Sequence, residues 1–134
     1  MEQLFSNPYI NIYLHQGLPK TIEIQWLDFV PSADFRASMR EMVHLARQHQ
    51  VTVWTADNRL IRALRTADLA WTGEEVLKPM AELGVRRLAV VESLDAMNRM
   101  GVTALFSDVI PGTQMSQRFF SSMEEARVWA KAPL

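Results

Sequence analysis

The side chains best suited to chemistry gather in one short segment, from Trp54 to Arg59. Its polar residues Asp57, Asn58 and Arg59 follow a β-branched run, so we expect them at the carboxyl end of a strand, where open α/β sheets bind ligands. An aromatic plane, a carboxylate, an amide and a guanidinium can together hold a small polar ligand or a partner's side chains. Trp54, Asp57, Asn58 and Arg59 are therefore candidate ligand- or partner-binding residues. The alternative is a structural turn, because Asp-Asn favours turns and Arg59 can pair with Asp57.

No other segment has the spacing of a catalytic or metal site. The histidines His15, His44 and His49 lack an HExxH pattern, the chain has no cysteine, and the glycines form no phosphate-binding loop. The acidic pairs Glu74-Glu75 and Glu124-Glu125 fit first helical turns, where negative charge complements the helix dipole. We therefore predict no catalytic residue, metal or cofactor, and a protein that is not an enzyme.

Composition limits the classes of partner. The 134 residues are 49% hydrophobic and 22% charged, which predicts a single globular domain spanning residues 1–134. The net charge of -1 leaves no basic surplus for nucleic acid. The apolar runs are too short for membrane insertion, and the N-terminus does not resemble a secretory signal, so we expect a cytoplasmic protein.

Hydrophobic periodicity predicts strands that alternate with helices. Period-two alternation marks two strands, 9–14 and 21–26, as an antiparallel hairpin, and helical spacing follows from Ser32, the expected N-cap, to about His49. Further strands are expected at 51–55, 87–91 and 115–120, each followed by a helix. The order β-β-α-β-α-β-α-β-α predicts an α/β fold with a mixed, mainly parallel five-stranded sheet.

The second helix has two possible starts. Thr72 begins a sequence typical of a capping box, and Thr66 is the rival. Pro79 must kink this helix or lie near its end, because proline has no backbone N–H to donate.

The alternation also predicts that the helices lie mainly on one face of the sheet. Strands covered on both faces are apolar on both sides, whereas the first two strands place polar residues on one side. The other face would then carry Tyr9, Tyr13 and Trp54, which we take as candidate interface residues of a homodimer. Alternatively, these aromatic side chains only pack against the sheet.

The pattern resembles a group of small bacterial proteins of unknown function with the SpoIIAA-like fold, which includes the STAS domains and is similar to the CRAL-TRIO (Sec14-like) domains. The residues that carry the resemblance are the initial hairpin, Trp54-x-x-Asp57-Asn58-Arg59, Trp71, Glu75, Pro79 and the strand at Arg87. The resemblance implies a mixed sheet and a non-enzymatic role. STAS domains of the anti-sigma factor antagonists carry a phosphorylatable serine after the central strand, and this chain has none there.

Three functional hypotheses follow. The first is a non-catalytic regulatory or protein-interaction domain, which binds a regulatory partner or a second copy. The second is a carrier or sensor of a small ligand or lipid with a Sec14-like pocket. The third is an enzyme with Asp57 as base and Arg59 as anion clamp, and an ion pair between these two residues on a flat surface would remove its support.

Overall fold

Six strands form one sheet in the computed structural model, which describes residues 1–134. The strands lie in chain order: β1 (Glu2–Ser6), β2 (Ile10–His15), β3 (Thr21–Trp26), β4 (Val53–Asp57), β5 (Arg87–Val91) and β6 (Ser116–Phe120). β1, β2 and β3 pair antiparallel, and β3 to β6 pair parallel. The predicted mixed, mainly parallel sheet is confirmed, but it has six strands rather than five.

The additional strand is β1, which lacks the alternation that marks β2. A β-bulge at Leu4 places Gln3 opposite Tyr13 and Phe5 opposite Ile12, so Gln3 and Phe5 point to opposite faces. Residues two apart on a regular strand share a face. The bulge therefore removes the period-two signal from the sequence.

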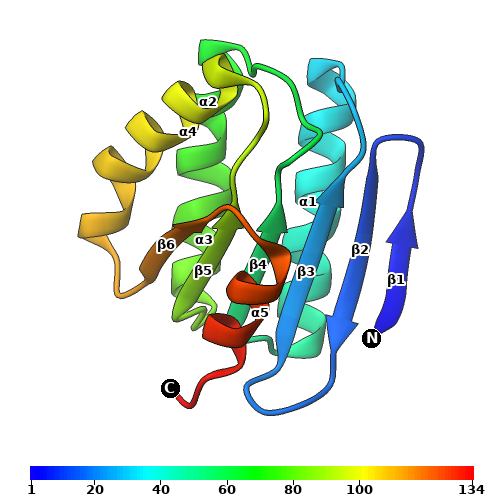
Figure 1. Ribbon diagram of the computed structural model, residues 1–134, viewed down its shortest axis with the longest axis vertical. Coiled ribbons are helices and arrows are strands. Elements are labelled where there is room, and N and C mark those ends of the chain that lie inside the picture. The colour runs from blue at the N-terminus through cyan, green and yellow to red at the C-terminus, as the bar shows by residue number, and fades with distance from the viewer.

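Helices follow each of the parallel strands. They are α1 (Ser32–His49), α2 (Thr66–Thr72), α3 (Lys78–Glu82), α4 (Ala96–Val109) and α5 (Met123–Lys131), with a π turn η1 (Gly73–Leu77) and a 3₁₀ turn η2 (Ile110–Gly112). The helices α1 to α4 cover one face of the sheet, here called the front face, which points away from the viewer in Figure 1. Helix α5 lies on the opposite, back face, toward the viewer. The prediction of helices mainly on one face is confirmed. None of the helices is long and apolar enough to cross a membrane.

The front face carries the main core. Ile22, Ile24 and Trp26 of β3 are at most 2% exposed there and belong to the main hydrophobic cluster under α1 and α4. The back face has a smaller core, in which Val53, Ala89 and Val91 contact Ala126 and Ala130 of α5. Because α5 packs mainly on β4, β5 and β6, it leaves most of the back face of β1 to β3 without a helix.

Pro79 disturbs its helix as predicted, through a π turn. The N–H of Lys78 donates to the carbonyl of Gly73, five residues earlier, immediately before the proline that cannot donate at all. The helix begins at Thr66, so Thr72 is not its cap.

Ser32 is not the N-cap of α1, because Pro31 occupies that position. The Ser32 hydroxyl instead donates to Asp68 Oδ1 on α2 at 2.7 Å, and Arg36 Nε donates to the same oxygen at 2.8 Å. Burial alone would raise the pKa of Asp68, but these two hydrogen bonds and the charge of Arg36 outweigh it and lower the pKa. Asp68 thus joins the first turns of α1 and α2.

Candidate functional site

Asp57 and Arg59 form a paired unit at the end of β4. Arg59 donates from Nε to Asp57 Oδ1 at 2.9 Å and from Nη2 to Oδ2 at 2.8 Å, and its backbone N–H donates to Oδ1 at 3.1 Å. The hydrogen bonds and the charge of Asp57 raise the pKa of the Arg59 guanidinium. Asp57 is 5% exposed and both of its oxygens accept hydrogen bonds from Arg59, so the carboxylate is the structural partner of this guanidinium.

Trp54 does not lie beside this pair. Successive residues of a strand point to opposite faces, so Asp57 faces the back of the sheet and Trp54 faces the front. Trp54 is 3% exposed and belongs to the main core. The expected grouping of an aromatic plane with the carboxylate and guanidinium is therefore wrong, as is the placement of Trp54 on the polar face. The cause is that β4 is buried on both sides. Its sequence therefore does not indicate which residues point to the front face and which to the back face.

A small cavity lies on the front face beside Trp54. It measures about 40 Å³, and Trp54, Asn58, Thr72 and Asn98 are among its mostly apolar lining residues. The indole Nε1 of Trp54 is buried and has no hydrogen-bond partner. This volume is far below the roughly 300–1,000 Å³ of ordinary ligand pockets, so the cavity does not accommodate a lipid chain in this conformation.

A much larger open cleft lies at the carboxyl ends of β3, β4 and β5. Its volume is about 480 Å³, and we call it the carboxyl cleft. It is lined by Asp28, Arg59, Leu60, Ile61, Arg62, Leu94 and Asp95. Of the candidates taken from the sequence, only Arg59 lines it. The other residues come from three separate loops, and no spacing in the sequence connects them.

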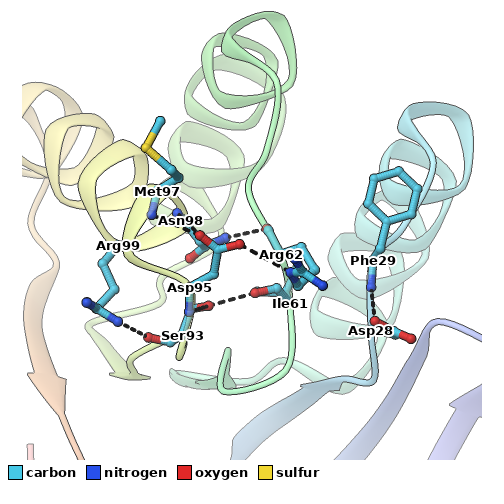
Figure 2. A network of polar contacts seen from close by, with 9 residues as sticks. All are labelled: Asp28, Phe29, Ile61, Arg62, Ser93, Asp95, Met97, Asn98 and Arg99. Atoms are coloured by element: carbon cyan, nitrogen blue, oxygen red, sulfur yellow. Dashed lines mark hydrogen bonds and ion pairs between the residues drawn. The ribbon is translucent and has the colours of Figure 1, made fainter.

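A network of hydrogen bonds joins two loops of this cleft (Figure 2). Ser93 Oγ donates to the carbonyl of Ile61 at 2.6 Å, and Asn98 Nδ2 donates to that of Arg62 at 3.0 Å. Asp95 caps α4 by accepting from two backbone N–H groups and also accepts from Arg62 Nε at 3.3 Å. The loop after β4 is therefore fixed to the N-terminus of α4.

Large apolar side chains project into solvent around the carboxyl cleft. Leu94 is 78% exposed, and the other three are Phe29 at 57%, Leu60 at 49% and Met97 at 65%. Met97 and Phe29 lie on opposite sides of Arg62 (Figure 2). Single exposed apolar residues are ordinary, but several around one cleft indicate an interaction site.

The back face holds a second polar group, centred on Glu23. This residue is 3% exposed, although it lies on the face that β3 shares with Tyr13. Arg127 of α5 binds both Glu23 oxygens, at 3.0 Å and 2.8 Å, and His15 Nε2 lies 3.2 Å from Oε1. Hydrogen bonds to Glu23 raise the pKa of Arg127, so the guanidinium stays charged. This ion pair connects α5 to the half of the sheet that it does not cover.

The two tyrosines predicted for the back face differ in position. Tyr13 lies there, half-buried, opposite Gln3 and Glu23. Tyr9 precedes β2 and packs against the main core instead. No three His, Asp or Glu side chains come together in a way that could hold a metal ion.

His15 gives the folded protein a predicted pH dependence. Burial, together with the charges of Lys131 and Arg127, lowers the pKa of His15 by more than the neighbouring Glu23 raises it. As the pH falls below about 6.5, the unfolded chain therefore gains a proton that the folded chain does not, and the free energy of unfolding decreases. We expect His15→Gln, which keeps an N–H donor for Glu23, to reduce this decrease. Urea unfolding of both proteins between about pH 7.5 and pH 5.5 measures the difference, and parallel curves would contradict the prediction.

Comparison with known proteins concerns the fold. No protein-family model matches the chain, and no curated protein matches its sequence. A solved structure does match: an uncharacterised protein from the DUF3478 family with a SpoIIAA-like fold, from Shewanella loihica PV-4. The match covers 95% of this chain and 98% of the other, with a TM-score of 0.62 and 16% sequence identity. The chain has the SpoIIAA-like fold.

The resemblance inferred from the hairpin and the Trp54 to Arg59 segment is thus confirmed at the level of fold. An identity of 16% supports nothing finer than the fold. The features of this chain that bear on its function are therefore the carboxyl cleft, the small cavity and the back face.

Proposed function

We propose that this SpoIIAA-like protein is a non-catalytic protein-interaction domain whose partner binds at the carboxyl cleft. The observation that carries the proposal is a set of four exposed apolar side chains at one open cleft. Leu60 and Leu94 line the cleft, and Phe29 and Met97 lie close to its lining residues Asp28 and Asp95 (Figure 2). Burial of such side chains is the main favourable contribution to protein association. A cleft at the carboxyl ends of parallel strands is also the usual binding position in α/β folds.

The rigidity of the cleft supports this role. Ser93 and Asn98 hold the backbone of the loop after β4 by side-chain hydrogen bonds to Ile61 and Arg62. A surface that is ordered before binding loses less conformational entropy when the partner arrives. The exposed Leu60 lies on this loop, so the network fixes an apolar contact in advance.

The charged groups of the cleft favour recognition over chemistry. Asp57 is occupied by Arg59, and Asp95 by Arg62 and the N-terminus of α4. These two carboxylates therefore have structural partners, whereas Asp28 of the cleft keeps one oxygen free. The Arg62 side chain is 65% exposed and its guanidinium keeps free N–H groups, which suits hydrogen bonds to a partner.

The alternative of a ligand or lipid carrier has less support. The buried, unpaired Nε1 of Trp54 favours a ligand with a hydrogen-bond acceptor, but the adjoining cavity of about 40 Å³ is too small for a lipid chain. A carrier would need the residues that line this cavity to move apart before a ligand could enter. The carboxyl cleft needs no such movement.

Photo-crosslinking tests the proposal. A photoreactive phenylalanine derivative at position 94 is expected to give a discrete adduct with a partner chain in the cell, because Leu94 is 78% exposed at the cleft. The matched control is the same derivative in place of Val128 on α5, which is 69% exposed and away from the cleft. Absence of an adduct at position 94, or equal adducts at both positions, would overturn the proposal.

A further inference from the structure

We infer that the partner at the carboxyl cleft is a second copy of this chain, related to the first by a two-fold axis. The inference rests on the proposed function and specifies its partner. In a two-fold contact the same surface meets itself, so the surface must be self-complementary in charge and in shape.

The charges of the cleft fit this requirement. The carboxylate of Asp28 makes one hydrogen bond, from the N–H of Phe29 to Oδ1 at 2.7 Å, and its other oxygen is free. Arg62 uses only Nε, toward Asp95, and keeps its terminal N–H groups free. Asp28 and Arg62 come from different loops that line the same cleft (Figure 2). A two-fold axis through the cleft pairs Asp28 of each copy with Arg62 of the other.

The apolar side chains fit it as well. Phe29 projects beside Asp28, and Leu60 and Leu94 lie along the cleft. Each copy thus has a projecting ring and a cleft that can receive one. In the two-fold contact, Phe29 of each copy enters the cleft of the other. The contact then buries apolar surface at its centre and places the charge pairs around it, which is the usual anatomy of an interface.

The balance of charge favours a second copy over a strongly charged partner. An acidic segment would approach Asp28, and a basic segment would approach Arg59 and Arg62, so each would meet a like charge within the cleft. A second copy brings both signs in the complementary arrangement. The net charge of -1 adds little repulsion between two copies.

The test is the mass in solution of charge-reversed variants, measured by sedimentation equilibrium. We expect the unmodified chain to show twice the chain mass at micromolar concentration. Asp28→Arg and Arg62→Glu each place like charges together at both symmetry-related contacts, and each is expected to weaken the dimer by at least about tenfold. An equimolar mixture of the two variants restores both opposite-charge contacts in the heterodimer. The mixture is therefore expected to dimerise like the unmodified chain.

Controls separate the interface from folding and from the back face. Leu94→Asp changes a side chain that is 78% exposed, so it should abolish the dimer without lowering monomer stability. Tyr13→Ala on the open back face should leave the mass unchanged. A dimer lost in Tyr13→Ala but kept in Leu94→Asp would overturn the inference, and so would failure of the mixture to dimerise.

The result also distinguishes the inference from the proposed function. If the unmodified chain is a monomer at every concentration, the second copy is excluded. The photo-crosslinking experiment then tests the proposed function separately. An adduct between position 94 and a different protein would still support an interaction domain. Absence of both the dimer and the adduct would contradict both.

Discussion

Arg127→Leu is expected to lower the free energy of unfolding by about 3–5 kcal/mol. The reason is Glu23, whose side chain is 4% exposed and whose two oxygens both accept hydrogen bonds from the Arg127 guanidinium. Leucine fills part of the space of Arg127 but cannot neutralise the negative charge of the Glu23 carboxylate. Glu23 would then be a buried charge with His15 as its remaining partner. Chemical denaturation with urea measures the loss.

A second substitution identifies the cause. Glu23→Gln in the Arg127→Leu background removes the uncompensated charge, so the double variant is expected to be more stable than Arg127→Leu alone. The matched control is Arg118→Leu, since Arg118 contacts the rings of Phe120 and Trp129 but has no ion pair. That control should cost about 1 kcal/mol or less. If Glu23→Gln brings no recovery, lost packing rather than the buried charge explains the effect.

The ion pair between Glu23 and Arg127 could not be predicted from the sequence. Glu23 and Arg127 lie 104 residues apart, and their contact depends on α5 crossing to the back face. Hydrophobic periodicity indicates which residues of α5 are apolar, but it does not indicate which side of the sheet they meet. The position of α5 follows from small side chains, Ala126 and Ala130, which fit against Val53, Ala89 and Val91.

The fold class was predictable because most of its signals are local. The alternation in β2 and β3 and the helical spacing of α1 depend on neighbours within a few residues. β1 was missed because its bulge breaks the alternation. Trp54 was placed on the wrong face because a strand covered on both sides shows no contrast between its two sets of residues.

The site was only partly predictable for a related reason. The pairing of Asp57 with Arg59 spans two residues, and the sequence already offered it as the structural alternative. The carboxyl cleft combines loops after three strands, so Asp28, Arg62 and Asp95 have no shared spacing. The available signal was limited to Leu94, which stands among the polar residues Glu92, Ser93 and Asp95, whereas Leu60 begins a mostly apolar segment with Ile61 and Leu64. Only the structure shows that the side chains of Leu60 and Leu94 are exposed at the same cleft.

Phe35→Ala is expected to have the second large effect, a loss of about 3–5 kcal/mol in the free energy of unfolding. Phe35 is 2% exposed, and it joins α1 to the sheet and to α2. Its ring stacks on Trp26 with centroids 5.3 Å apart and meets Trp71 edge-on at 6.3 Å. Truncation removes both aromatic contacts together with the buried apolar area.

Phe29→Ala provides the matched control, because it is the same chemical change only six residues earlier at a side chain that is 57% exposed. In monomeric protein it should change stability by about 0.5 kcal/mol or less. Phe35 also lines the cavity of about 40 Å³, so Phe35→Ala should enlarge that cavity toward the roughly 150 Å³ that accommodates benzene. We therefore expect benzene to raise the thermal unfolding temperature of Phe35→Ala and not that of the unmodified chain. A stabilised unmodified chain would instead show that the cavity beside Trp54 already opens to ligands, and would favour the carrier function over the interaction domain.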